Sequence, residues 1–149
     1  MAPISELELV GRLALATLFG FLIGLEREFA GQPAGERTHA LAALGSATFA
    51  LISLSAFPGS DSARVAAGVV TGLGFLGAGM ILKQGDEKVY GLTTAAGIWA
   101  VGGIGLSIGA GLYLLGTSTA ILVGLLLGLE RVLKIDHRLE QRRQKERKQ

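Results

Sequence analysis

Three long stretches of this sequence contain no charged side chain. Residues 40–60, 65–82 and 89–129 lack Asp, Glu, Lys and Arg over 21, 18 and 41 positions. A helix needs about 20 apolar residues to cross the hydrocarbon core of a bilayer. Three such runs in a chain of 149 residues, half of them hydrophobic, exclude an ordinary soluble domain. They predict a protein that crosses a membrane several times.

Five transmembrane helices account for the apolar segments. We predict the first three at about residues 9–25, 39–57 and 64–82. The 41-residue run is too long for one helix, and we expect it to divide near "SIGAG", residues 107–111, into a fourth span from about Gly91 and a fifth ending near Leu129.

Local sequence signals support two of the helix starts. Ser5 followed by Glu8 fits a capping box at the start of the first helix. Pro58-Gly59 closes the second helix, and Asp61 or Ser62 is expected to cap the third. Gly85 is a suitable stop after the third helix.

The distribution of Lys and Arg predicts the orientation. Residues 131–148 hold eight of them, which places the C-terminal segment in the cytoplasm. With five spans, the connections after the first and third helices are also cytoplasmic and carry four more, so that twelve basic residues lie inside and only Arg12 and Arg64 lie outside. A count of four or six spans worsens this split.

The predicted fold class is therefore an all-α, polytopic membrane helical bundle of five transmembrane helices, with the N-terminus outside and the C-terminus cytoplasmic. Residues 1–130 form the membrane domain, and residues 131–149 form a basic, helical cytoplasmic tail. That tail could continue the fifth helix, lie on anionic lipid or pair with a partner or second copy, or it could be a solvated topology anchor.

The glycines of "TGLGFLGAG", residues 71–79, match the dinucleotide-binding pattern G-x-G-x-x-G at Gly72, Gly74 and Gly77. That function needs a preceding strand, a following helix and an acidic residue about 20 positions on. The chain offers an uninterrupted apolar run instead, and the next acids, Asp86 and Glu87, come too early. We therefore reject a dinucleotide site.

In a membrane, glycines favour close approach of helix backbones, because burial of apolar surface does not drive association there. The third span carries Gly68-x-x-x-Gly72 and a further small residue, Gly79. Small-residue spacings of this kind recur at Gly20/Gly24, Gly105/Gly109 and Gly124/Gly128. We predict a tightly packed bundle with the third and fourth spans at its centre. The alternative is that the glycine-rich centre, with Gly74 and Gly77, lines a transport path.

Charged and polar residues gather where the first span ends and the second begins. Ionisable groups at such positions tend to be paired or functional. Pairs between Glu26 and Arg37, or between Arg27 and Glu36, are geometrically reasonable. One interpretation is a salt-bridged hairpin that fixes topology, with His39 as a hydrogen-bonded helix-end residue. The other is a cytoplasmic site for a cation, a lipid headgroup or a partner protein, formed by Glu26, Arg27, Arg37, Thr38 and His39.

A second polar stretch, "KVYGLTTAAGIW", opens the fourth span. The hydroxyls of Thr93 and Thr94 can cap backbone N–H groups or bond across helices. Trp99 lies too deep for the simplest interfacial role and is expected to pack against the glycine faces. Capping and packing are the simpler interpretation of these residues, and a lining role in a transport path is the alternative.

Motifs for enzymatic chemistry are missing from the sequence. It contains neither G-x-x-x-x-G-K-[ST] nor H-E-x-x-H, and no acidic residue lies in the middle of a span. We therefore expect no enzyme activity, no catalytic residues and no cofactor, and the sequence leaves open whether a metal binds. The lack of buried mid-span carboxylates also argues against an ion-coupled transporter.

Four segments of the sequence resemble the MgtC/SapB family of bacterial and archaeal inner-membrane proteins. They are "LIGLEREFAG", "ERTHALAALG", "GLGFLGAGMILK" and "GLTTAAGIWAVGGIGLSIGAG", and they follow one another in the family's order and spacing over about residues 10–130. The motif positions in this chain are Gly24, Glu26, Arg27, Arg37, Thr38, Gly45, Gly74, Gly77, Gly79, Gly91, Thr93, Thr94 and Trp99.

The resemblance implies a multi-pass protein of the cytoplasmic (inner) membrane with a five-span hydrophobic domain. It also implies a non-enzymatic role in modulating membrane partners, in magnesium or ion homeostasis or stress adaptation, and in virulence where the organism is a pathogen. Better-known members carry a soluble cytoplasmic domain after the last span. Here about twenty residues follow it, so the resemblance does not carry over roles that depend on that domain.

Two functions remain open at this point. The first is a membrane modulator that binds a membrane protein partner through its glycine faces or cytoplasmic loops. The alternative is an oligomeric channel or carrier for a cation or small solute. Both imply contact with the lipid bilayer and a homo-oligomer, with a dimer as the default, and neither involves nucleic acid.

Overall fold

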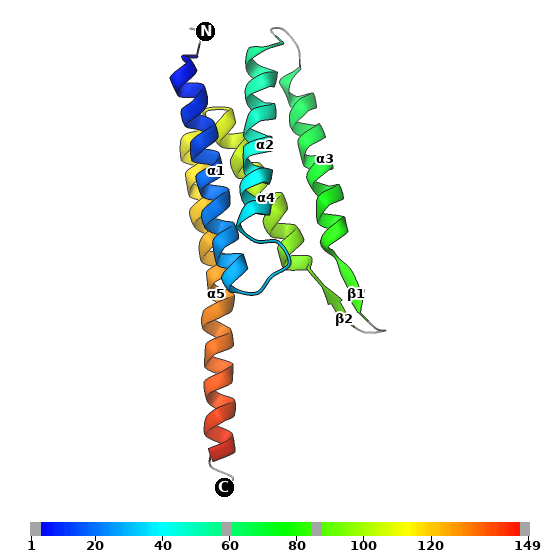
Figure 1. The fold of residues 1–149 in the computed structure, drawn as a ribbon, viewed down its shortest axis with the longest axis vertical. Helices are drawn as coiled ribbons and strands as arrows, with labels where there is room; N and C mark the ends of the chain where they lie inside the picture. Colours follow the sequence, from blue (N-terminus) through cyan, green and yellow to red (C-terminus); the bar gives the residue numbers. More distant parts are fainter. Residues whose placement is uncertain (1–3, 58–60, 85–87, 147–149) are drawn as a thin grey trace.

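Five helices and one short hairpin make up the computed structural model of the chain (Figure 1). It describes residues 4–57, 61–84 and 88–146, and the side chains among them except those of residues 82–88 and 130–146. The helices are α1 (Glu6–Phe29), α2 (Glu36–Ser55), α3 (Ser62–Met80), α4 (Leu92–Gly109) and α5 (Tyr113–Glu146).

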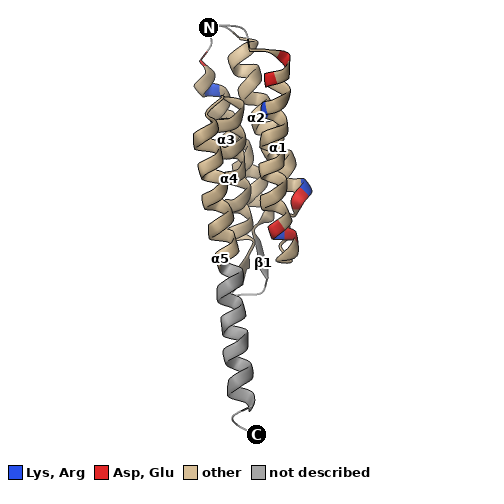
Figure 2. Cartoon of the chain, turned by 90° about the vertical axis from the view of Figure 1, so that its left-hand side faces the viewer, with Lys and Arg blue, Asp and Glu red and all other residues tan. Residues whose placement is uncertain are grey.

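Four of the helices are long and apolar enough to cross a membrane: α1, α2, α3 and α4. The described apolar section of α5, Tyr113–Leu129, is slightly shorter. The charged residues of the described part gather toward the two ends of the bundle, and the stretch between is free of them (Figure 2). These features confirm the predicted multi-pass, all-helical membrane bundle.

The chain enters and leaves the bundle at opposite ends (Figure 1). We name the end where α1 begins the outer end and the end where α1 stops the inner end, following the predicted orientation, which itself stays a prediction. An odd number of spans requires termini on opposite sides, and the arrangement of α1 and α5 meets that requirement.

The helix starts follow the expected capping chemistry at two positions. The Ser5 hydroxyl accepts a hydrogen bond from the Glu8 amide at 3.2 Å, and the Asp61 carboxylate accepts one from the Ala63 amide at 3.0 Å. Each side chain satisfies an amide that has no partner within its own helix. Helix α4 differs, because its N-cap is Gly91 and no side chain caps it. The predicted capping by Thr93 or Thr94 is therefore wrong.

Helix α4 occupies the centre of the bundle and α3 its edge. Of the apolar window of each helix, 56% is buried in α4 and 11% in α3. The largest fully buried apolar side chains, Ile98, Val101, Ile104 and Ile108, all belong to α4. Helix α4 packs on the other four helices, whereas α3 packs chiefly on α4 and α2 (Figure 1). The prediction that the third span is central is therefore wrong, and the prediction for the fourth is right.

Glycines permit the closest helix contacts inside the bundle, as predicted for two of the pairs. A Cβ added to Gly20 of α1 would lie 2.6 Å from the His39 carbonyl oxygen of α2. A Cβ at Gly109 of α4 would lie 2.5 Å from the Ala47 carbonyl oxygen of α2. These distances are far below van der Waals contact, so only glycine lets α2 approach α1 and α4 this closely.

The connections around α4 depend on glycines with positive φ. The predicted break in the 41-residue run is confirmed: α4 ends at Gly109, and Gly111 turns the chain into α5 with φ +81°. Before α4, β1 (Leu82–Gln84) pairs with β2 (Lys88–Tyr90) in an antiparallel hairpin that we did not predict. The predicted stop at Gly85 lies outside the described residues. Gly91, with φ +88°, then leads from the hairpin into α4.

Candidate functional site

The inner end of the bundle contains a buried arginine. The Arg27 side chain lies in the last turn of α1, is only 1% exposed and donates from Nε to the Glu26 carboxylate at 2.5 Å. Its Nη2 donates to the backbone carbonyl of Leu127 in α5 at 3.0 Å. A guanidinium group can do both because its donors point in several directions from one plane. Arg27 thus joins the end of α1 to α5.

His39 lies beside this arginine, in the first turn of α2, and is completely buried. Its Nδ1 lies 3.0 Å from the Gly35 carbonyl oxygen. A carbonyl oxygen only accepts, so Nδ1 carries the hydrogen, and in the neutral ring Nε2 then holds the lone pair. Nε2 is buried without a hydrogen-bond partner among the described residues, and it faces Gly97 of α4. The prediction that His39 is a hydrogen-bonded residue at a helix end is confirmed. The sequence did not predict that its Nε2 would be buried without a partner in the described part.

The loop between α1 and α2 is tied to α4 by one polar contact. The Thr94 hydroxyl, fully buried in the first turn of α4, donates to the Gln32 side-chain carbonyl at 3.2 Å. The predicted alternative to capping was a hydroxyl that bonds across helices, whereas the observed partner of Thr94 lies in the loop between α1 and α2. Thr93, by contrast, is exposed.

The ion pairs at the inner end differ from the predicted ones. Among the described residues, the carboxylates pair with their sequence neighbours, Glu26 with Arg27 and Glu36 with Arg37, the latter at 3.7 Å. The predicted Glu26–Arg37 and Arg27–Glu36 pairs are therefore wrong. The reason is that Arg27 turns inward toward α5 while the Arg37 side chain, 92% exposed, extends away from the bundle. The structure thus brings Glu26, Arg27 and His39 together, leaves Thr38 partly buried and places Arg37 on the surface.

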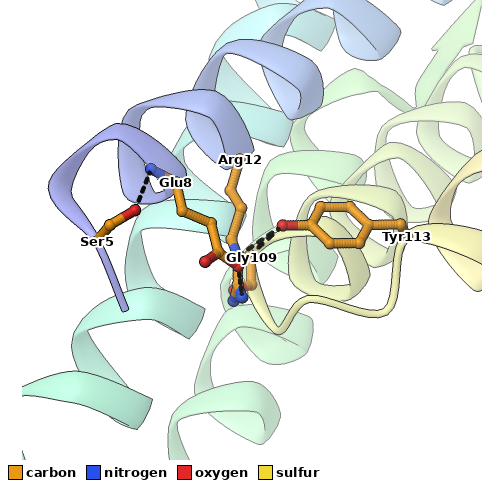
Figure 3. Close-up of polar contacts among 5 residues, drawn as sticks. All are labelled: Ser5, Glu8, Arg12, Gly109 and Tyr113. Carbon is orange, nitrogen blue, oxygen red and sulfur yellow. Dashed lines mark hydrogen bonds and ion pairs between the residues drawn. The ribbon is translucent and has the colours of Figure 1, made fainter. Parts of the chain in front are cut away.

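The outer end has a second buried arginine that the sequence analysis did not identify as a site (Figure 3). Arg12 donates to the Gly109 carbonyl at 2.9 Å, to the Tyr113 hydroxyl at 3.0 Å and to the Glu8 carboxylate at 2.5 Å. Tyr113 also donates to Glu8 at 3.3 Å. The network holds the start of α1 against the turn between α4 and α5. The i, i+4 spacing of Glu8 and Arg12 is the sequence signal that could have found it.

The glycines of α3 lie on an open surface. A Cβ added to Gly68, Gly72, Gly74 or Gly79 would meet no atom within 4 Å. Only Gly77 has a neighbour, Ala95 of α4, at an ordinary 3.5 Å. Helix packing at the other four is therefore not found within one chain, and it stays a prediction for contacts with another chain. Trp99 is 55% exposed, so its predicted packing against glycine faces is not found either.

Gly68, Gly72 and Gly79 share one side of α3, because residues at i, i+4 and i+11 lie along one face of a helix. We call these three residues the glycine face. Next to it, Gly68 and Gly72 line an apolar groove of about 510 Å³ between α3 and α2, with Phe49 and Leu76 among its walls.

The chemistry of the inner end is that of a small polar site. Among the described residues, no group of three or more His, Asp or Glu side chains is placed to hold a metal ion. The site does offer two buried acceptor atoms without partners in the described part, Glu26 Oε1 and His39 Nε2. It can therefore accept hydrogen bonds from a donor that reaches the inner end of the bundle.

Comparison with known proteins identifies relatives over most of the chain. The profile described as the MgtC family matches residues 13–136. The chain is 44% identical over 128 residues to the "Putative magnesium transporter YhiD" of Escherichia coli (strain K12), covering 80% of this chain and 59% of the relative. It is 46% identical over 118 residues to protein SrpB of Synechococcus elongatus, covering 70% of this chain and 65% of the relative.

A third relative is protein MgtC of Brucella abortus, 50% identical over 100 residues, which are 67% of this chain and 42% of the relative. The chain therefore spans between about two fifths and two thirds of the length of these three relatives. No solved structure matches it.

Proposed function

The chain belongs to the MgtC family, and from this premise we propose that it is a non-enzymatic protein of the cytoplasmic (inner) membrane that modulates another membrane protein. The processes proposed are magnesium or ion homeostasis and stress adaptation, with a role in virulence where the organism is a pathogen. The proposed contact surface is the glycine face of α3. A homo-oligomer, by default a dimer, is part of the proposal.

The observation that carries this proposal is the open side of α3. The helix is apolar enough to span the membrane, yet only 11% of it is buried within the chain. Three glycines on one side leave its backbone accessible to a neighbouring helix. Close backbone approach at small residues is what holds helices together in lipid. A partner helix packed on this face would make closer van der Waals contacts with α3 than lipid chains can make.

A complementation experiment tests the proposal. In a host strain from which the gene has been deleted, we expect Gly68→Leu combined with Gly72→Leu to abolish growth rescue in magnesium-limited medium. The purified variant should keep the helical content and melting temperature of the unsubstituted protein, because a Cβ at either position meets no atom of the same chain within 4 Å and the adjoining groove has room for the rest of the side chain. The matched control is Gly103→Leu on α4, which is also exposed and open and should retain rescue. Full rescue by the α3 variant would overturn the proposal.

A second candidate function, an oligomeric carrier for a cation or small solute, is favoured by the inner end. Glu26 Oε1 and His39 Nε2 are buried polar atoms without partners in the described part, and such groups in membrane helices often mark ion or proton paths. It ranks second because no carboxylate lies in the middle of a span.

Flux measurements separate the two functions. Proteoliposomes that contain only this protein should show no magnesium, potassium or proton flux if it is a modulator. Flux that Glu26→Gln alters would establish the carrier instead and make the inner end a transport site.

A further inference from the structure

A cavity of about 280 Å³ lies at the outer end of the bundle, between α2, α3 and α4. We propose that it binds the ester region of a membrane glycerolipid, with the hydroxyl of Ser53 donating a hydrogen bond to an ester carbonyl of the lipid. The cavity is separate from the glycine face and from the inner end, and the inference does not depend on the proposed function.

Ser53 is the first reason for this assignment. It lines the cavity and is 5% exposed, and its hydroxyl finds no hydrogen-bond partner among the described residues. Six other helical Ser and Thr hydroxyls donate to the carbonyl four residues earlier: those of Thr17, Ser46, Thr48, Thr71, Ser107 and Thr119. A buried hydroxyl that makes no such bond is costly unless another acceptor reaches it. Ser53 therefore has a free donor at the wall of a cavity.

The polarity of the lining is the second reason. Three serines, Ser53, Ser62 and Ser107, line the cavity together with leucines and alanines. No Asp, Glu, Lys or Arg is among the described residues of the lining. The nearby Asp61 carboxylate is already used to cap α3. A neutral hydrogen-bond acceptor attached to an apolar chain suits such a surface better than a free phosphate does. The ester group of a glycerolipid is such an acceptor.

The depth of the cavity is the third reason. Ser53 lies two residues before the end of α2, Ser62 is the first residue of α3, and Ser107 lies two residues before the end of α4. At a rise of 1.5 Å per residue, all three are within about 3 Å of a helix end. The interfacial layer on each side of the hydrocarbon core is roughly 5–8 Å thick. The serines therefore lie near the boundary where lipid esters are found. Leu54 and Leu106, which also line the cavity, would contact the first carbons of the acyl chain.

A lipid held there would touch all three helices at once. Helix α3 gains most from it, because α3 has few contacts of its own in the bundle. The bound lipid would then act as a wedge that supports the outer end of α3 against α2 and α4.

Native mass spectrometry of the full chain in detergent tests the assignment. The probes are dioleoyl phosphatidylethanolamine and its ether-linked analogue, which has the same headgroup and chains but lacks the ester carbonyls. We expect the ester lipid to be retained about fivefold more than the ether lipid, which corresponds to about 1 kcal/mol for one hydrogen bond. Ser53→Ala should remove this preference, and the control Thr71→Val should keep it.

Ala66→Leu, which fills the cavity from α3, should remove retention of both lipids. Equal retention of ester and ether lipids by the unsubstituted protein would overturn the proposal, and so would an ester preference that survives Ser53→Ala. The comparison of the two lipids needs no variant, so the test holds even where a substituted chain fails to fold.

Discussion

Helices α3 and α4 are both rich in glycine and apolar residues, yet they use their glycines in opposite ways. In α4, Gly105 and Gly109 press against backbone atoms of α2, and a side chain at either position would collide with them. In α3, Gly68 and Gly72 have open space beside them. The same residue type at the same spacing thus serves contacts inside the chain in one helix and remains available to a different molecule in the other.

The comparison shows what small-residue spacing means in a membrane protein. It marks a surface where a backbone can be approached, but it does not name the helix that approaches. The helix that approaches is known only from the folded bundle, in which α4 packs on the other four helices and α3 packs chiefly on α4 and α2.

The largest expected effect comes from filling a contact of α4. Gly105→Ala places a Cβ against the Ala43 carbonyl oxygen and 2.9 Å from the Ser46 Cβ. Because backbone atoms cannot move aside easily, we expect the free energy of unfolding in detergent–lipid micelles to fall by about 3 kcal/mol or more, at the upper end of what overpacking costs. Gly103→Ala, on the open side of the same helix, is the control and should be nearly neutral. Equal stability of the two variants would show that α2 and α4 are not in close contact.

A smaller loss is expected at the buried arginine that holds the end of α4. Arg12→Gln removes the donors to the Gly109 carbonyl and the Tyr113 hydroxyl, and we expect a loss of about 1–3 kcal/mol in the same unfolding measurement. Arg64→Gln, at the exposed start of α3, provides the matched control and should cost less than about 0.5 kcal/mol. Similar losses of unfolding free energy for both variants would show that α4 is held in the bundle no more firmly than α3.

The smallest effect is expected on the glycine face. Gly72→Ala adds a methyl group that meets no atom within 4 Å, and alanine favours a helix over glycine by about 1 kcal/mol in water. The unfolding free energy of the isolated protein should therefore stay constant or rise by up to about 1 kcal/mol. A loss as large as that of Gly105→Ala would mean that the glycine face is already packed in the purified protein.

The sequence was sufficient to predict the number of helices, the break before Gly111 and a cap at Asp61 or Ser62, of which the structure has Asp61. These features depend on local composition and on the length of each apolar run, which the sequence shows directly. The close contacts of Gly20 and Gly109 were also predicted, because small residues four apart mark one side of a helix.

The position of α3 and the ion pairs at the inner end could not be predicted in this way. Helical periodicity shows which residues share a side, but not which helix faces that side. A long arginine side chain can also turn to either side of its helix. Arg27 turns inward to a carbonyl of α5, one hundred residues away, and no local pattern contains that choice. The orphaned hydroxyl of Ser53 is equally invisible in sequence, because six similar hydroxyls bond within their own helices.

The central place of α4 also bears on how the protein is made. Helices leave the ribosome in chain order, so α1 and α2 can pair through Gly20 while the rest is still being synthesised. Helix α3 then enters the bilayer before its main partner exists. The largest fully buried apolar side chains of the core, three isoleucines and one valine, all arrive with α4. A ribosome that stalls before α4 would therefore leave a nascent chain with a paired α1–α2 hairpin, an unattached α3 and no completed core. Such a chain should be a substrate for the membrane's quality-control proteases.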